Sequence, residues 1–114
     1  MNEQTHAQLV ANQIPEFLHL MEVSLRSGYN VSQCLEIAVK DMSGPMTTEV
    51  QLVLAEAKAG VPLLQAFDNW LSRCPSLDLD LTVATIHEQM EAGGNLANKF
   101  QFVAQVLPKL KRVG

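Results

Sequence analysis

The sequence has few aromatic residues, few cysteines and no long apolar run. Aromatic residues make up only 5% of the chain, a composition that suits helix-on-helix packing better than a sheet. The two cysteines, Cys34 and Cys74, lack CxxC spacing. This favours small buried apolar residues in a reducing compartment, with a disulfide or a metal pair as the less favoured alternative. No stretch of roughly 18 apolar residues occurs, so nothing within this chain is expected to span a bilayer.

Net positive charge is also missing. The formal net charge is −4, and only the segment from Lys109 to Arg112 is locally basic. Phosphate binding needs a concentrated basic surface, so this balance argues against a nucleic-acid partner. The length of 114 residues, 47% of them hydrophobic, is that of about one globular domain. We expect a flexible segment over residues 1–13 and a single domain over residues 14–112.

A turn pattern occurs three times. In each copy a small residue and Gly are followed by Asn or Pro and then an aliphatic residue, as in Ser27-Gly28-Tyr29-Asn30-Val31, Ala59-Gly60-Val61-Pro62-Leu63 and Ala92-Gly93-Gly94-Asn95-Leu96. The glycines at 28, 60 and 93 are 32 and then 33 residues apart. A near-regular period of this length indicates stacked supersecondary units. Here each unit is predicted to be a helical hairpin.

Helix start and stop signals predict six helices and no strand. The first helix is expected to begin at Pro15 and to end at Gly28, and Asn30 with Gln33 caps the second. The third is expected to begin at Pro45 and end at Gly60, and Pro62 is the first residue of the fourth. Ser76 and Asn95 are expected to cap the fifth and sixth helices, and Pro108 to kink or end the sixth. The predicted fold is all-α, with six antiparallel helices as three hairpins in a compact bundle.

Apolar residues recur at helical spacing and predict the core. Phe17 and Met21 face inward from the first helix, Phe67 and Trp70 from the fourth, and Met90 from the fifth. The turn residues are expected to be structural rather than functional: Gly28, Asn30, Gly60, Pro62, Gly93, Gly94 and Asn95.

No residue pattern predicts catalysis, a cofactor or a metal site. His87-Glu88 begins like a zinc-protease motif, but Glu91 stands where the second His is needed. His6 falls in a segment expected to fray, and His19 has no ligand partner at suitable spacing. An anion at the amides after Gly93-Gly94 is a weak alternative to a simple helix cap. We therefore expect a protein that is not an enzyme and carries no cofactor.

The segments at the turns together resemble the type II secretion system F domain. They are Ser27-Gly28 followed by Cys34-Leu35, Ser43-Gly44-Pro45, Val53-Leu54-Ala55-Glu56 leading into Ala59-Gly60-Val61-Pro62-Leu63, and Gly93-Gly94-Asn95-Leu96. The resemblance runs from about Ile14 to Leu107. This family comprises inner-membrane platform proteins of type II secretion, type IV pilus and tight-adherence pilus machines. A single copy of the domain resembles the tight-adherence branch, or one domain cut from a larger chain.

The resemblance implies a non-enzymatic domain on the cytoplasmic face of the inner membrane, joined to membrane helices absent from this chain. It would couple the assembly ATPase to pilin or pseudopilin subunits through protein–protein contacts, and self-association is a further expectation. Candidate partner contacts are the charges predicted to point outward: Glu36, Lys40, Asp41, Glu49, Glu56, Glu88 and Glu91.

Two readings of the basic C-terminal segment stay open. Lys109, Lys111 and Arg112 are candidate membrane-proximal residues, because Lys and Arg flank the cytoplasmic ends of membrane spans. They equally suit the last turn of a helix, where cations complement the helix dipole. For the whole chain, the alternative function is a soluble scaffold similar to a tetratricopeptide array that binds a peptide. Its repeat has a similar period, but the Trp…Leu-Gly…Tyr pattern is missing here.

Overall fold

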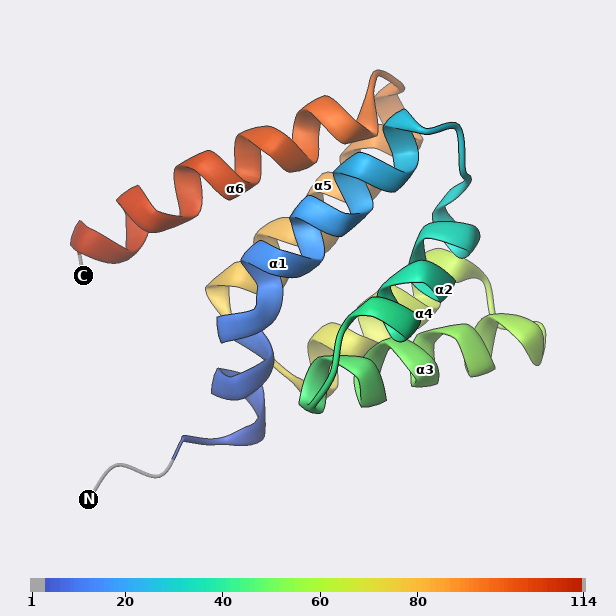
Figure 1. Ribbon diagram of the computed structural model, residues 1–114, viewed down its shortest axis with the longest axis horizontal. Coiled ribbons are helices and arrows are strands. Elements are labelled where there is room, and N and C mark those ends of the chain that lie inside the picture. Colours follow the sequence, from blue (N-terminus) through green and yellow to red (C-terminus); the bar gives the residue numbers. More distant parts are fainter. Residues whose placement is uncertain (1–3, 114) are drawn as a thin grey trace.

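The computed structural model describes residues 4–113, which form six helices and no strand. The helices are α1 (His6–Arg26), α2 (Val31–Asp41), α3 (Pro45–Lys58), α4 (Leu63–Arg73), α5 (Leu77–Ala92) and α6 (Leu96–Val113). Consecutive helices contact one another throughout, and α1 also contacts α3, α5 and α6 (Figure 1). The all-α fold predicted from the sequence is confirmed.

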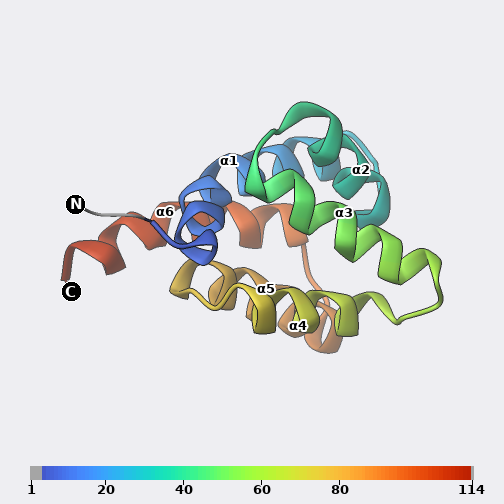
Figure 2. The same cartoon turned by 90° about the horizontal axis from the view of Figure 1, so that it is seen from below.

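The helices form two groups on opposite sides of the molecule. Seen from below, α4 and α5 run along one side, and α1 and α2 lie on the other (Figure 2). The last turns of α6 extend away from α2 and α3, toward the opposite end of the longest axis (Figures 1 and 2). The two ends of this 42 Å axis therefore present different helices to the surroundings.

Two of the three repeated turns share one backbone geometry. The amide of Tyr29 donates to the carbonyl of Ser24 at 3.2 Å, and the amide of Val61 donates to Glu56 at 3.0 Å. In each turn the amide donates to the carbonyl of the residue five positions earlier. This hydrogen bond is typical of a helix that is followed by a residue in the left-handed conformation. The left-handed residue is a glycine in each case, with φ of +100° at Gly60. The third turn differs, because Gly93 itself ends α5 and Gly94 adds a second positive φ.

Side-chain caps start three helices as the sequence predicts. The Asn30 side chain accepts from the amide of Gln33, whose own side chain accepts from the Asn30 amide. Ser76 caps α5 through the amide of Leu79, and Asn95 caps α6 through the amide of Asn98. Each cap satisfies amides that have no partner within the helix.

The start of α1 differs from the prediction. Helix α1 begins at His6, not at Pro15, and residues 6–13 of the segment expected to be flexible are its first turns. A capping box between Thr5 and Gln8 starts the helix. Pro15 lies inside α1, where it removes one backbone hydrogen bond and bends the helix. The bend is visible in the first half of α1 in Figure 1. Residues 1–3 lie outside the described residues.

Three smaller predictions also need correction. Pro62 precedes α4 as its N-cap, and the first helical residue is Leu63. Of the two outcomes expected at Pro108, an end of the helix is ruled out, because α6 continues to Val113. Met90 does not face the core, since 64% of its surface is exposed.

The core is aromatic at its centre. Phe17 of α1 and Trp70 of α4 meet edge to face, with ring centroids 5.5 Å apart and an interplanar angle of 88°. Phe67 packs against the same indole at 6.3 Å. All three side chains are fully buried, as their helical spacing predicts. This contact joins α1 to α4 directly.

Candidate interaction surfaces

A groove of about 470 Å³ lies between α2 and α3. Its floor is apolar, with Val39 from α2 and Leu54 and Ala55 from α3. Charged side chains border it: two of the predicted partner contacts, Glu36 and Lys40, together with Lys58 and the polar Gln51. None of the ion pairs among the described residues involves Lys40 or Lys58. The groove thus combines an apolar floor with two lysines that are available to an acidic partner.

A second, acidic hollow lies along α5. It has a volume of about 430 Å³, and its lining includes two predicted contacts, Glu88 and Glu91, with Asp68 and Asp80. His87 bonds to Asp68 at 2.7 Å, and Lys99 of α6 pairs with Glu88 at 2.6 Å. Two of these carboxylates, those of Asp68 and Glu88, therefore already have partners within the domain. The predicted contacts therefore divide between two faces of the domain.

Asp41 and Glu56 lie outside both hollows. Asp41 is exposed at the end of α2. Glu56 is half-buried, accepting from Asn69 at 3.0 Å and from Arg73 at 3.3 Å. Its carboxylate therefore links α3 to α4 as well as facing solvent.

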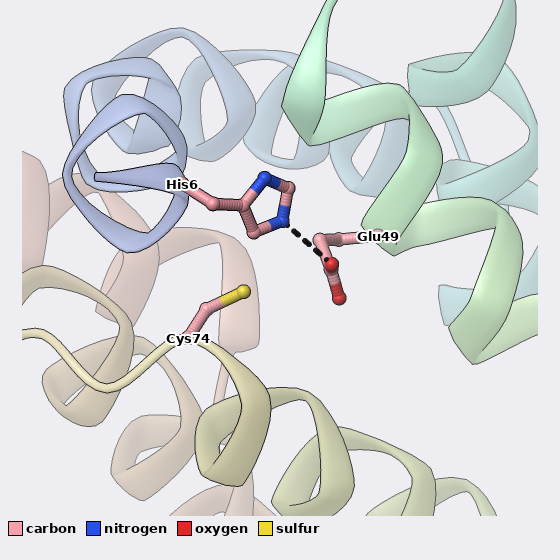
Figure 3. Close-up of side chains that lie close together, drawn as sticks. All are labelled: His6, Glu49 and Cys74. Atoms are coloured by element: carbon pink, nitrogen blue, oxygen red, sulfur yellow. Dashed lines mark hydrogen bonds and ion pairs between the residues drawn. The ribbon is translucent and has the colours of Figure 1, made fainter. Parts of the chain in front are cut away.

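The predicted outward placement of Glu49 is wrong. Only 5% of Glu49 is exposed. One carboxylate oxygen accepts from Arg73 Nε at 2.9 Å, and the other bonds to His6 Nε2 at 2.8 Å (Figure 3). Its charge put Glu49 among the predicted surface residues, but its place on α3 faces the start of α1 and the end of α4. A buried carboxylate is tolerated here because both oxygens have charged or polar partners.

The surroundings of Glu49 shift two ionisation equilibria. Burial raises its pKa, but the hydrogen bonds from His6 and Arg73 and the charge of Arg73 outweigh burial, so the pKa lies below its ordinary value. Burial raises the pKa of the Cys74 thiol to about 11, and the negative charge of Glu49 adds to this shift. At neutral pH the site therefore holds a carboxylate beside a protonated thiol.

Sequence reasoning missed this cluster for a physical reason. Its members come from positions 6, 49, 73 and 74, so no local spacing unites them. His6 was expected in a frayed segment, and only the helical start of α1 brings its ring to Glu49. The burial of Cys74 was expected, and both cysteines are buried free thiols.

The basic C-terminal segment is partly engaged within the domain. Lys111 pairs at 2.6 Å with Asp78, a carboxylate that is only 4% exposed at the start of α5. Lys109 and Arg112 are exposed on the last turns of α6. Of the predicted membrane-proximal residues, these two form no ion pair with another described residue. Among the described residues, no helix is long and apolar enough to cross a membrane.

Comparison with known proteins identifies one family. A family model described as "Type II secretion system (T2SS), protein F" matches residues 17–112, nearly the whole chain. No curated protein and no solved structure was found to match. The matched region begins after Pro15 and covers all six helices except the first turns of α1.

Proposed function

Because this chain belongs to the type II secretion system protein F family, we propose that it is the cytoplasmic domain of an inner-membrane platform protein for secretion or pilus assembly. Its work is to bind partners and to pass on movement, without catalysis. The match over residues 17–112 carries the proposal. Assignment to the tight-adherence branch stays a prediction, and so does self-association.

The groove between α2 and α3 is the proposed contact for the assembly ATPase. Its apolar floor of Val39, Leu54 and Ala55 suits a buried apolar side chain from the partner. Lys40 and Lys58 at its border suit carboxylates that flank that side chain. The partner segment is therefore expected to be acidic with an apolar anchor.

The end of α6 is the proposed membrane side. Lys109 and Arg112 are exposed there, at the end of the molecule opposite to α2 and α3 (Figures 1 and 2). Positive charge at such a place favours the cytoplasmic surface of a bilayer. With the ATPase contact at one end and the membrane at the other, a push on α2 and α3 would displace the packed domain as one body.

A binding experiment with matched charge changes tests the ATPase contact. We expect Lys40→Glu combined with Lys58→Glu to weaken binding of the assembly ATPase of the same machine by at least about tenfold, since each lost charge contact at an interface costs on the order of 1 kcal/mol. The control is Lys109→Glu combined with Arg112→Glu, which changes the net charge equally at the other end. Equal loss in both variants, or none in the first, would reject the groove as the contact.

Membrane association tests the platform proposal against the soluble scaffold. The full-length native protein is extracted with carbonate, and the pellet and supernatant are blotted. Retention in the membrane pellet is expected of a platform protein, because carbonate strips only proteins that lack spanning helices. Complete release would favour the scaffold.

A further inference from the structure

Three side chains of different ligand types converge at the edge of the core. They are His6 from the first turn of α1, Glu49 from α3 and Cys74 directly after α4 (Figure 3). One ligand atom from each, an imidazole nitrogen, a carboxylate oxygen and the thiol sulfur, all lie within 4.8 Å of one another. The family match assigns no role to these three residues, and His6 lies outside the matched region.

The donor set suits a borderline-soft divalent cation. Zn²⁺ takes thiolate sulfur at about 2.3 Å and imidazole nitrogen or carboxylate oxygen at about 2.0–2.2 Å, usually with four ligands. Mg²⁺ and Ca²⁺ need oxygen ligands in larger number. Around one tetrahedral ion the three atoms would lie roughly 3.3–3.8 Å apart. The His6 and Glu49 atoms, now 2.8 Å apart, would have to separate slightly, and any longer separation, at most 4.8 Å, would close by about 1 Å. His6 can supply that movement, because it lies in the first turn of its helix and its side chain is 49% exposed.

The surroundings orient the carboxylate and leave an entry path. Arg73 Nε donates to one oxygen of Glu49 at 2.9 Å, and the second oxygen faces His6. Carboxylate ligands of metals are commonly held in this way by an outer hydrogen bond. The positive charge of Arg73 lowers the affinity for any cation, while the ligand charges of Glu49 and Cys74 oppose that effect. The exposed side of His6 leaves room for water as a fourth ligand.

We propose that His6, Glu49 and Cys74 form a zinc site that ties the start of α1 to α3 and to the end of α4. On binding, the Cys74 thiol loses its proton to solvent as the sulfur–zinc bond forms. The proton that His6 Nε2 shares with Glu49 also leaves Nε2, to solvent or to Nδ1 of the same ring, so that zinc replaces this hydrogen bond. No electron is transferred, and the ion keeps its charge. The role is structural and does not depend on the proposed platform function.

Metal titration of the purified 114-residue chain, untagged and kept reduced, tests the site. Zn²⁺ is expected to bind with one ion per chain and to raise the melting temperature as its concentration rises, since a ligand that binds the folded state stabilises it. Co²⁺ used as a probe should show a thiolate-to-metal charge-transfer band. Mg²⁺ should leave the melting temperature unchanged.

Matched variants locate the site. Cys74→Ser and His6→Gln should each lower the Zn²⁺ affinity by at least about tenfold, no less than the loss of an outer-shell partner causes. Cys34→Ser, at the other buried cysteine, and His19→Gln, at an exposed histidine, should leave it unchanged. Because His6 is exposed, its substitution leaves the core intact, so the result does not depend on the folding of the cysteine variant. No charge-transfer band in the wild type, or a band that both His6→Gln and Cys74→Ser retain, would overturn the proposal.

Discussion

Two contacts join α1 to the α3–α4 hairpin, one buried and one partly buried, and they differ in kind. The first is the aromatic contact of Phe17 with Trp70, where no charged group takes part. The second is the polar contact of His6 with Glu49, which Arg73 extends across to α4. The aromatic contact gains stability from the area removed from water and is insensitive to pH. The polar contact depends on every partner being present, because an unpaired buried carboxylate is costly.

The two contacts also differ in how far a local stretch of sequence predicts them. Phe17 and Trp70 follow helical spacing, so their burial is visible in a local window. Glu49 shares the buried stripe of α3, three residues after Met46 and four before Val53, but its charge alone predicts a surface position. Its burial follows from where α1 begins, 43 residues earlier in the chain. Stability from apolar contact can thus be anticipated locally, whereas a polar cluster needs the tertiary arrangement.

The largest expected effect comes from the aromatic contact. Trp70→Ala should destabilise the domain by about 3–5 kcal/mol, the usual cost of removing a fully buried tryptophan. Denaturant unfolding followed by circular dichroism measures the loss. Trp70→Phe is the matched variant and should cost much less. It keeps most of the apolar volume and removes an indole N–H that has no partner among the described residues. Similar losses for both variants would show that the centre of the core is not packed as described.

A smaller, pH-dependent effect is expected at the polar contact. Glu49→Gln should destabilise by about 1.5–3 kcal/mol at neutral pH, the range for hydrogen bonds to charged groups. The pKa of Glu49 is lowered in the folded state, so the unfolded chain takes up its proton first as the pH falls. The contribution is therefore present above the ordinary carboxyl pKa and is lost as the pH falls through the folded-state value. The melting temperatures of both proteins should approach each other as the pH falls below the ordinary carboxyl pKa, and should meet below the lower folded-state pKa of Glu49.

The control for that experiment is the exposed pair of Glu22 and Arg26 within α1. Glu22→Gln removes a carboxylate of the same type from an i,i+4 surface pair, which contributes only about 0.3–0.5 kcal/mol. If the two Glu→Gln variants behaved alike at all pH values, Glu49 would have to be solvated rather than buried.

The smallest expected effect lies at a turn, away from both contacts. Gly60→Val should cost about 1 kcal/mol or more, since a β-branched residue fits a φ of +100° poorly. A Cβ at Gly60 would meet nothing within 4 Å, so the cost is conformational and not steric. Ala59→Val, at a right-handed neighbour, should cost less in the same thermal melt. Equal melting temperatures for the glycine variant and the wild type would contradict the turn geometry.

The sequence predicts most of the fold and less of the surfaces. Glycines and caps locate the helix ends. Gly60 adopts the positive φ that follows a helix end, and the Asn30 side chain accepts a hydrogen bond from a first-turn amide. The predicted start of α1 at Pro15 is wrong, because proline suits a first helical turn but is also tolerated inside a long helix that packs well. Among the predicted contacts, Glu36 and Lys40 do border a groove. That Lys58 also borders this groove, and that Glu49 is buried rather than exposed, follows only from the positions of α1, α2 and α3 in the fold.

Pro15 has a consequence for how α1 opens. The missing amide leaves the turns before it joined to the rest of the helix by one hydrogen bond fewer than elsewhere. Those turns stay in place through side chains, with Val10 and Ile14 in the core and His6 on Glu49. We therefore expect the turns before Pro15 to open to solvent more often than the rest of α1, at the cost of exposing Val10 and Ile14. The contact of His6 with Glu49 therefore influences how often these turns open.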